Sequence, residues 1–462
     1  MAQTPLSSKD TQRFLDKAFA PLLKTQSKIE QLTQVRESLI LKKGVRYFDW
    51  TASGLASTLV EKRVLKLLPF YANAHSEVSK HASLMQEVYT ESKARLKKSL
   101  GLGEDFIVLS AGFGASHAIK RFQEILGIYI PPKSRQVLGG LKGADLPQVI
   151  IGPYEHHSNE ISWREGLCEV VRLELDPQGL FSLEKLEQAL QEAQNKTRGF
   201  TPLVSIGVAS NVTGMIVPYR EISQLCARYQ ARLAFDAAAF SPHDNLENLD
   251  FDALFLSAHK LLGGVGTCGI LGVKKQLIDT NLPPSFSGGG VVKYVSRSTQ
   301  EYIEASDVRE EVGTYGLVQL FRAALALQLR DEIGTPTIRR RESMLSKVFM
   351  HALSQIPAVQ IYGNVHAPRL GNVAFNAGGV SCYALAHLLS HRFGIETRAG
   401  CSCAGPYGHD LLDMQDSSFS ALQEKGTKPG WLRVSLHYSH TLEDVDFLID
   451  RISKAIQTLR GG

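Results

Sequence analysis

Residues 255–264 read FLSAHKLLGG, in which an apolar run leads to Lys260, and two leucines then precede two glycines. Together with the apolar residues from Phe251 onward, this stretch predicts a buried strand. Burial disfavours the charged form of a lysine and lowers its pKa, so a lysine at the end of such a strand is suited to act as a nucleophile. We therefore expect the fold to be organised around a strand that ends in a reactive amine.

A second apolar run, residues 231–235, ends at Asp236. A carboxylate and an amine at the ends of two strands suit a pyridoxal phosphate (PLP) site, where a lysine bonds to the cofactor aldehyde and an acid keeps the pyridine nitrogen protonated. An ordinary buried ion pair between Asp236 and Lys260 is the alternative. Ser257 and His259, which can donate hydrogen bonds to a phosphate, favour the cofactor.

The composition is that of a soluble globular protein. The 462 residues are enough for two or three domains, and 44% are hydrophobic and 21% charged. A net charge of +5 without a dense basic block does not favour nucleic acid as a partner. No apolar run reaches the roughly 18 residues of a membrane span, and the N-terminus lacks the apolar core of an export signal. Six cysteines are too few for a disulfide scaffold, so we expect a cytoplasmic protein that is not bound to a membrane.

The order of predicted elements favours an α/β fold. Residues 9–41 have the spacing of an amphipathic helical arm. Strands then alternate with helices, with polar residues after several strand ends, which predicts an open parallel sheet that binds its ligand along one edge. A long apolar helix over residues 317–333 is expected to lead into a small α+β domain. We predict an N-terminal arm over residues 1–45, a large domain over residues 46–315 and a C-terminal domain over residues 316–462.

The segment from Phe106 to Phe122 passes from a predicted strand through Gly112 and Gly114 into a predicted helix. Unpaired backbone N–H groups at a helix N-terminus suit an anion. The spacing matches neither the dinucleotide-binding fingerprint nor the Walker loop, and a plain strand-to-helix connection is the alternative.

Nine short motifs occur in an order that resembles a known family. They are RYFDWTAS (46–53), FGASHAIK (113–120), YEHHSN (154–159), ASNVTG (209–214), FDAAA (235–239), SAHK (257–260), EEVGTYG (310–316), RAGCSCAGP (398–406) and LRVSLHYSHTLEDVD (432–446). Together they resemble the fold-type I PLP enzymes of aminotransferase class V, and within it the cysteine desulfurase and selenocysteine lyase-like branch. The resemblance implies a large domain with a mostly parallel seven-stranded sheet, a smaller C-terminal α+β domain and a homodimer.

The resemblance also assigns roles to single residues. Lys260 would bond to the cofactor aldehyde, and Asp236 would pair with the pyridine nitrogen. His156 would stack on the ring, with a polar turn residue as its alternative. Asn211 would hydrogen-bond near the cofactor oxygen and the substrate carboxylate.

Two arginines and a group of phosphate contacts complete the implied site. Arg433 would clamp the substrate carboxylate in a bidentate manner. Arg398 would help, with an exposed structural arginine as its alternative. The residues implied to bind the phosphate are Gly114, Ala115, Ser116, Ser257 and His259, joined by Gly313 and Thr314 of the other subunit.

Cys403 occupies the position of the desulfurase nucleophile, which takes the γ-sulfur of the substrate as a persulfide and leaves alanine. Its alternatives are a buried structural cysteine, a disulfide with Cys401, and a metal site made of Cys401, Cys403 and His409. A reducing compartment disfavours the disulfide, and the lack of a clear fourth ligand disfavours a metal. We therefore expect no metal.

Four departures from the family pattern leave the exact reaction open. Ala239 stands where the family has Gln, and Cys401 and Ser402 stand where it has two histidines. His117 replaces a Glu beside the phosphate site, and His440 replaces an Asn or Thr.

We expect a homodimeric PLP enzyme acting on a small amino acid, most closely a cysteine desulfurase or C–S lyase with a second protein as its sulfur acceptor. A class V aminotransferase, epimerase or other lyase that does not use Cys403 is the alternative enzyme. A degenerate PLP-binding fold or an interaction protein is the alternative without catalysis.

Overall fold

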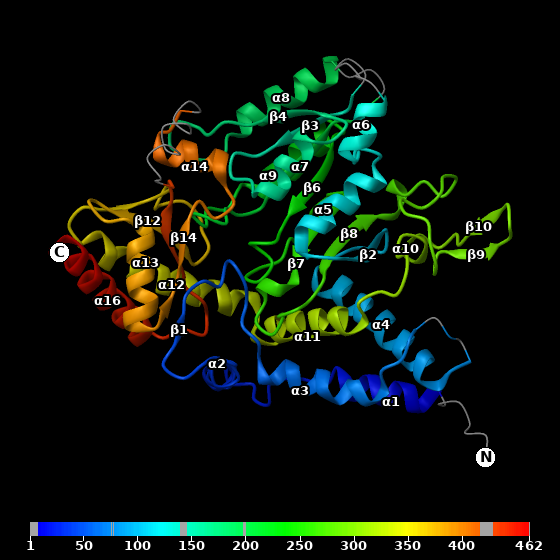
Figure 1. The fold of residues 1–462 in the computed structure, drawn as a ribbon, viewed down its shortest axis with the longest axis horizontal. Helices are drawn as coiled ribbons and strands as arrows, with labels where there is room; N and C mark the ends of the chain where they lie inside the picture. Colours follow the sequence, from blue (N-terminus) through cyan, green and yellow to red (C-terminus); the bar gives the residue numbers. More distant parts are fainter. Residues whose placement is uncertain are drawn as a thin grey trace.

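The computed structural model describes residues 8–74, 76, 78–138, 146–196, 200–415 and 428–461. A sheet of seven strands lies at its centre (Figure 1). In spatial order the strands are β2 (Phe106–Ala111), β8 (Gly269–Lys274), β7 (Ala253–Ser257), β6 (Arg232–Asp236), β5 (Leu203–Gly207), β3 (Gln148–Ile151) and β4 (Glu169–Arg172). Strand β8 runs antiparallel to both neighbours, and the other neighbours pair in parallel. The predicted α/β fold with a mostly parallel seven-stranded sheet is confirmed.

Helices cover both faces of this sheet, which explains why its strands are continuous apolar runs. Phe255 of β7 packs with Ile119 and Phe122 of α5 (Gly114–Ile125). Its neighbours Leu254 and Leu256 belong to the hydrophobic cluster on the opposite face. That cluster includes residues of α4 (Lys80–Ser99), α8 (Leu183–Lys196), α9 (Tyr219–Arg228) and α11 (Leu317–Ile333). With both faces buried, these strands have no solvent side that would call for alternating polar residues.

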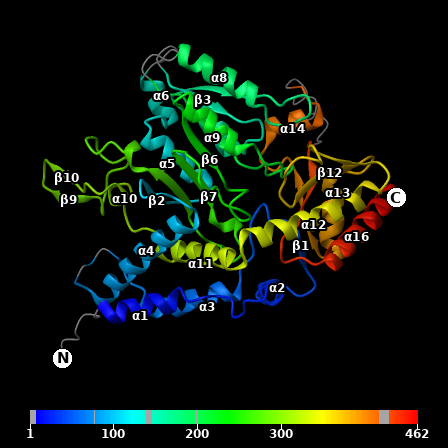
Figure 2. The same cartoon turned by 180° about the vertical axis from the view of Figure 1, so that it is seen from behind.

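A second sheet of four antiparallel strands forms the C-terminal part of the molecule. Its order is β11 (Val359–Ile361), β12 (Asn372–Ala377), β15 (Trp431–Ser435) and β14 (Arg398–Gly400). Residues of α12 (Thr335–Ser354), α13 (Cys382–Phe393) and α16 (Leu442–Gly461) share a hydrophobic cluster with it. Seen from behind, α11 leads into α12 and so from one sheet to the other (Figure 2). Arg398 and Arg433 are direct cross-strand partners on β14 and β15.

The N-terminal helices lie along the lower edge of the molecule in Figure 1. They are α1 (Ser8–Ala18) and α2 (Lys28–Glu37), and α3 (Thr58–Leu67) follows them. The predicted amphipathic arm is therefore two helices, because the segment between them contains Pro21, which has no backbone N–H and disfavours a helical residue before it. The backbone N–H groups of Leu22 and Leu23 donate to the Glu332 carboxylate over 2.8–3.0 Å. The domain boundaries at residues 45 and 315 stay predictions.

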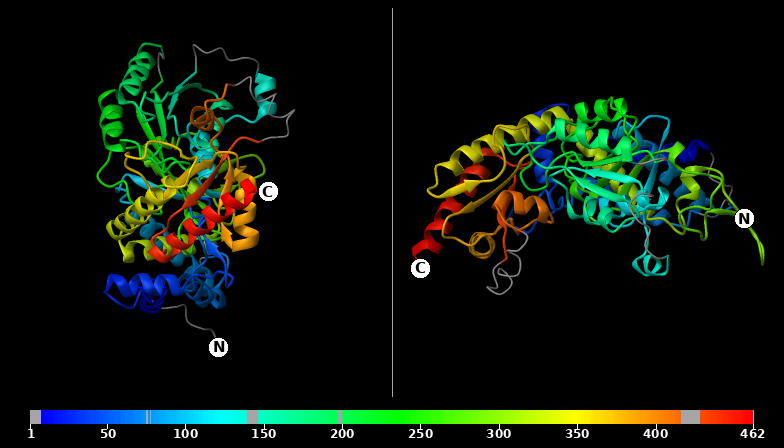
Figure 3. Two further views of the ribbon diagram at one scale, coloured as in Figure 1. Left: turned by 90° about the vertical axis from the view of Figure 1, so that its left-hand side faces the viewer. Right: turned by 90° about the horizontal axis from the view of Figure 1, so that it is seen from above.

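Shorter elements complete the fold. They are β1 (Arg46–Tyr47), which pairs in parallel with β13 (Ile395–Glu396), α6 (Pro132–Leu138), α7 (Ile161–Arg164), β9 (Val292–Val295), β10 (Gln300–Tyr302), α10 (Ser306–Arg309), α14 (Gly405–Leu412), and the 3₁₀ helices η1 (Leu68–Phe70), η3 (His157–Asn159), η4 (Ala258–Lys260) and η5 (Lys275–Leu277). From above, the β9–β10 hairpin and α16 lie at opposite ends of the molecule (Figure 3). None of the helices in the described ranges is both long and apolar enough to cross a bilayer.

Replacing Glu332 with Ala should loosen the N-terminal helices, because it leaves two backbone N–H groups of the arm without their acceptor. We expect the free energy of unfolding in urea to fall by about 1–3 kcal/mol. Glu301→Ala is the matched control, since among the described residues that exposed side chain pairs only with Lys293, at 3.4 Å, and its loss should change stability by less than about 0.5 kcal/mol. Equal effects of the two substitutions would show that the Glu332 contact does not hold the arm.

Candidate active site

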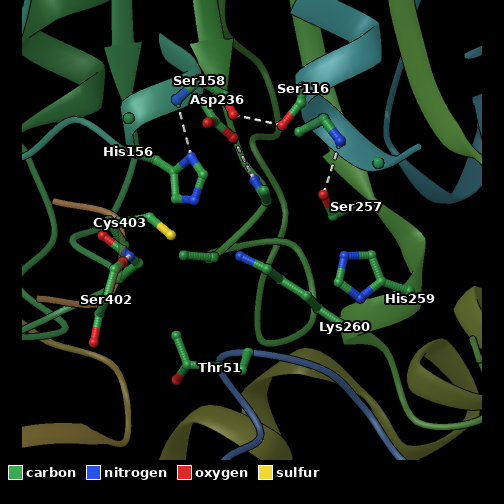
Figure 4. A pocket seen from close by; sticks show the side chains of 18 of the residues that line it. Thr51, Ser116, His156, Ser158, Asp236, Ser257, His259, Lys260, Ser402 and Cys403 are labelled. Carbon is green, nitrogen blue, oxygen red and sulfur yellow. Dashed lines mark hydrogen bonds between the residues drawn. The ribbon is translucent and has the colours of Figure 1, made fainter. Parts of the chain in front are cut away.

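A cavity lies at the carboxyl ends of β6 and β7, where they meet the β14–β15 edge of the second sheet. It brings together most of the residues predicted from the sequence: Gly114, Ala115, Ser116, His156, Asn211, Asp236, Ser257, His259, Lys260, Arg398, Cys403 and Arg433. Figure 4 shows several of these side chains directed into the cavity. The carboxyl ends of parallel strands are the usual ligand-binding edge of such a sheet.

Lys260 follows β7 as the last residue of η4, and its amine points into the cavity (Figure 4). Although its side chain keeps some exposed surface toward the cavity, the surrounding protein disfavours the charged form and lowers the pKa of Lys260 to about 8, against the opposing effect of Asp236. Burial raises the pKa of the Asp236 carboxyl, whose Oδ1 accepts a hydrogen bond of 2.9 Å from the Ala238 N–H. The two groups line one cavity from neighbouring strands.

The start of α5 forms a cradle of hydrogen-bonding groups beside this pair. Gly114 has φ +64°, and the next backbone N–H, of Ala115, donates to Ser257 Oγ over 2.8 Å. A Cβ added at Gly114 would lie 2.9 Å from Ser257 Oγ and 3.6 Å from His259 Nε2. Ser116 hydrogen-bonds to Ser158 at the rim. Hydroxyl and N–H groups at a helix N-terminus suit a phosphate, and the missing side chain at Gly114 leaves room for one.

His156 and Asn211 form another wall of the cavity. His156 Nδ1 accepts a hydrogen bond of 3.1 Å from the Ser158 N–H, and burial followed by the nearby Lys260 lowers the pKa of His156 to about 3. The ring is therefore neutral at pH 7, with its proton assigned to Nε2. Asn211 Nδ2 donates to the Ser402 carbonyl over 2.6 Å, whereas the buried Asn211 Oδ1 has no hydrogen-bond partner among the described residues. An unpartnered buried oxygen at a cavity wall is suited to accept a hydrogen bond from a ligand.

The two arginines face the cavity from the second sheet. Arg433 is only 2% exposed, and its guanidinium donates to Asp49 Oδ1 over 2.6 Å and to the Asn211 carbonyl over 2.8 Å. Its Nε is buried and has no partner among the described residues. Burial lowers the pKa of Arg433, and Asp49 opposes that shift. Asp49 therefore orients Arg433, and Arg398 lies beside it on β14.

The Cys403 sulfur points into the cavity, near the His156 ring and the Lys260 amine (Figure 4). The thiol is partly exposed, so Cys403 is not a buried structural cysteine. Cys401 and Cys403 are both free thiols, not a disulfide. In the part of the chain that the structure describes, no three His, Cys, Asp or Glu side chains are grouped in a way that could hold a metal ion.

Gly313 and Thr314 do not line this cavity. The Gly313 N–H donates to the Gly289 carbonyl over 2.7 Å. Thr314 lines a separate cavity, together with His117 and Arg121. The role assigned to Gly313 and Thr314 involves a second subunit, so it stays a prediction.

Other cavity residues were not singled out in the sequence. They include Thr51, Ala52, Phe113, Tyr154 and Ser158. Ala239 and Ser402, both named above as departures from the family pattern, also line the cavity. Thr51 and Ser158 belong to the RYFDWTAS and YEHHSN motifs, and this position could have identified them as residues of the site. The contact of Asp49 with Arg433 could not be predicted from the sequence, because the two residues are 384 positions apart.

Comparison with known proteins agrees with this arrangement. The family profile described as aminotransferase class-V matches residues 46–448. A cysteine desulfurase of Salmonella agona (strain SL483) is 30% identical over 313 residues, 66% of this chain and 70% of the relative. A probable cysteine desulfurase of Synechocystis sp. is 27% identical over 330 residues, 69% of this chain and 71% of the relative. The apo structure of a cysteine desulfurase from Thermococcus onnurineus NA1 has a TM-score of 0.76 at 24% identity, covering 92% of this chain and 98% of that one.

In protein without a bound cofactor, the Lys260 amine should become reactive at a lower pH than that of Lys293. Because its pKa is lowered to about 8, its labelling by trinitrobenzenesulfonate should rise from pH 6.5 and level off above roughly pH 9. Lys293, whose pKa is raised by hydrogen bonds to Glu304 and Glu301, is the control and should still gain reactivity above that pH. Peptide mapping by mass spectrometry follows both sites. Parallel pH profiles for the two lysines would contradict a lowered pKa at Lys260.

Proposed function

Because the chain belongs to the aminotransferase class-V family, we propose that it is a PLP-dependent cysteine desulfurase, which converts L-cysteine to alanine and takes the released sulfur onto Cys403 as a persulfide. The observation that carries the proposal is the Cys403 thiol in the wall of the cavity that also holds Lys260, Asp236 and Arg433. The resemblance seen in the sequence motifs to this family is confirmed. The cytoplasmic location predicted from the sequence stays a prediction.

The residues of the cavity fit PLP. The Gly114 cradle, which a Cβ would fill, suits the phosphate, and the unpartnered Asn211 Oδ1 suits a donor on the ring or the substrate. Lys260 would hold the aldehyde carbon, Asp236 the pyridine nitrogen and His156 the ring face. When bound, PLP supplies an electron sink for negative charge that develops on the substrate.

The residues of this chain bind the substrate and move its proton. With its pKa lowered to about 8, Lys260 Nζ has a larger neutral fraction near physiological pH than an ordinary lysine, and this neutral amine would take the proton from the substrate Cα. Arg433 would bind the substrate carboxylate, in an orientation fixed by Asp49, and the unpartnered Arg433 Nε is available as a donor. Arg398 adds a second positive charge at this end of the cavity. Because His156 is neutral, the arginines supply the positive charge that binds the substrate carboxylate.

Cys403 would carry out the sulfur transfer as a thiolate. Its electron pair forms a bond to the substrate sulfur, and the pair of the substrate C–S bond stays on Cβ, which is then protonated to the methyl group of alanine. One C–S bond breaks and one S–S bond forms, so no external oxidant is needed. The product on the protein is Cys403–S–SH.

We further propose a homodimer in which Gly313 and Thr314 reach the phosphate site of the other subunit, and a sulfur-acceptor protein that removes the product. The positions of Gly313 and Thr314 away from the cavity of their own subunit support the first part of this proposal.

Purified protein supplied with PLP and L-cysteine should release alanine, which chromatography of derivatised amino acids measures directly. Cys403→Ser should reduce this release by roughly 100-fold or more, because it removes the group that accepts the sulfur. Cys226→Ala is the control, since Cys226 is 1% exposed in α9, away from the cavity, and alanine release should be retained. If Cys403→Ser released alanine at the rate of the unmodified protein, a lyase or aminotransferase that does not use Cys403 would be the better description.

Gly114→Ala should prevent PLP binding, because the added methyl group would lie 2.9 Å from Ser257 Oγ in the cradle. The matched control is Gly127→Ala. Gly127 has a similar φ of +69°, but its added Cβ would meet no atom within 4 Å. Both substitutions strain the backbone by about 1 kcal/mol, so only Gly114→Ala should lose the visible absorbance of bound PLP after gel filtration. Equal PLP retention in the two variants would place the phosphate elsewhere.

A further inference from the structure

We propose that Cys401 is a second sulfur-carrying residue: it takes the outer sulfur of the Cys403 persulfide and presents it at the protein surface. This inference rests on the proposed function, in which Cys403 receives the sulfur from the substrate. It adds a transfer of sulfur from Cys403 to Cys401, within one turn of the chain, before a sulfur-acceptor protein takes part.

Cys401 and Cys403 differ from the other cysteines in their access to solvent. Cys401 is exposed and Cys403 partly exposed, whereas Cys168, Cys226, Cys268 and Cys382 are buried. Burial raises the pKa of each of the four buried thiols, to about 12 for the first three. These four thiols are therefore protonated and inaccessible at neutral pH, and only Cys401 and Cys403 remain as sulfur carriers.

Hydrogen bonds fix the Cys403 backbone in the cavity wall. The Cys403 carbonyl accepts from the His157 N–H over 2.9 Å, and the Ser402 carbonyl accepts from Asn211 Nδ2 over 2.6 Å. On the other side, the Gly405 N–H donates to His157 Nε2 over 2.7 Å. With the backbone held on both sides of its thiol, Cys403 keeps its sulfur inside the cavity where the substrate binds. An acceptor must then enter the cavity, or a neighbouring thiol must carry the sulfur outward.

The chain geometry makes Cys401 that neighbour. The Cys401 carbonyl accepts a hydrogen bond of 3.1 Å from the Ala404 N–H, which closes a four-residue turn. Ser402 and Cys403, at its centre, have φ +54° and +58°, a region that residues other than glycine rarely occupy. Two residues apart, the Cα atoms of Cys401 and Cys403 are separated by at most about 7 Å. Sulfur–sulfur bonds span Cα separations of about 4.4–6.8 Å, and the extra sulfur of a persulfide adds reach.

The transfer is balanced without an oxidant. The Cys401 thiolate attacks the outer sulfur of Cys403–S–SH, and the S–S bond breaks with its electron pair going to Cys403 Sγ. One S–S bond breaks and one forms, giving Cys401–S–SH and a Cys403 thiolate ready for the next substrate. Attack on the inner sulfur would instead release hydrosulfide and leave a Cys401–Cys403 disulfide, which would require a reductant.

Mass spectrometry can locate the sulfur on each cysteine. The holoenzyme is mixed with L-cysteine without reductant, quenched with iodoacetamide and digested with trypsin, which leaves both cysteines in the peptide 399–425. Fragmentation between the two cysteines should find extra sulfur on each of them in the unmodified protein. Cys401→Ser should confine it to Cys403, and Cys403→Ser should remove it from both positions.

Sulfur transfer to acceptor thiols of different size can distinguish a relay through Cys401 from a purely structural role of that residue. Cys401→Ser should slow sulfur transfer to the single free thiol of serum albumin, which cannot enter the cavity, by roughly tenfold or more. Transfer to dithiothreitol, which can enter, should change little. Cys226→Ser, at a buried thiol, is the control for both acceptors.

Three results would overturn the relay alone: extra sulfur found on Cys403 but never on Cys401, a Cys401–Cys403 disulfide with free sulfide as the main product, or unchanged transfer to albumin in Cys401→Ser. Extra sulfur on Cys401 in the Cys403→Ser variant would also overturn it, since Cys401 would then take sulfur from the substrate directly. Absence of extra sulfur from both cysteines, together with absence of alanine, would overturn the proposed function as well.

Discussion

The burial of Lys260 is the constraint on which the site depends. Strand β7 is buried along its whole length, because helices cover both faces of the central sheet, and the amine that follows it emerges at the end of this apolar layer. Burial there favours a neutral amine, while the same surroundings push Asp236 on the neighbouring strand toward its neutral form. Both groups are thus shifted in the direction of their neutral forms, and the neutral form is the one in which a lysine acts as a nucleophile.

The remaining groups reach the cavity through contacts between distant parts of the chain. Pairing of β14 with β15 sets Arg398 beside Arg433, and Asp49, just after β1, holds the Arg433 guanidinium. Asn211 joins both parts, since its carbonyl accepts from Arg433 and its amide donates to the turn that carries Cys403. A displacement of either sheet relative to the other would move the carboxylate-binding arginine and the thiol together.

The sequence predicted the central sheet well because its strands are apolar runs that end in polar residues, as at Asp236 and Lys260. It also identified most residues of the cavity, since they lie in short motifs. It could not reveal the Asp49–Arg433 pair, because that contact depends on how the two sheets meet. Nor could it reveal the positive φ angles of Ser402 and Cys403, because neither is a residue type that favours such angles. The arm that was predicted as one helical segment consists of two helices, because the spacing of apolar residues alone does not predict the break near Pro21.

The contact of Leu22 and Leu23 with Glu332 also has a bearing on how the chain folds as it leaves the ribosome. The partners are about 310 positions apart, so Leu22 and Leu23 meet the Glu332 carboxylate, and α2 meets α11, only after α11 has been synthesised, whereas α1 can pack earlier against α3 and α4. At about 5–20 residues per second, translation delays the contacts with Glu332 and α11 by tens of seconds. The N-terminal arm therefore completes its packing only after every strand of the central sheet has been made.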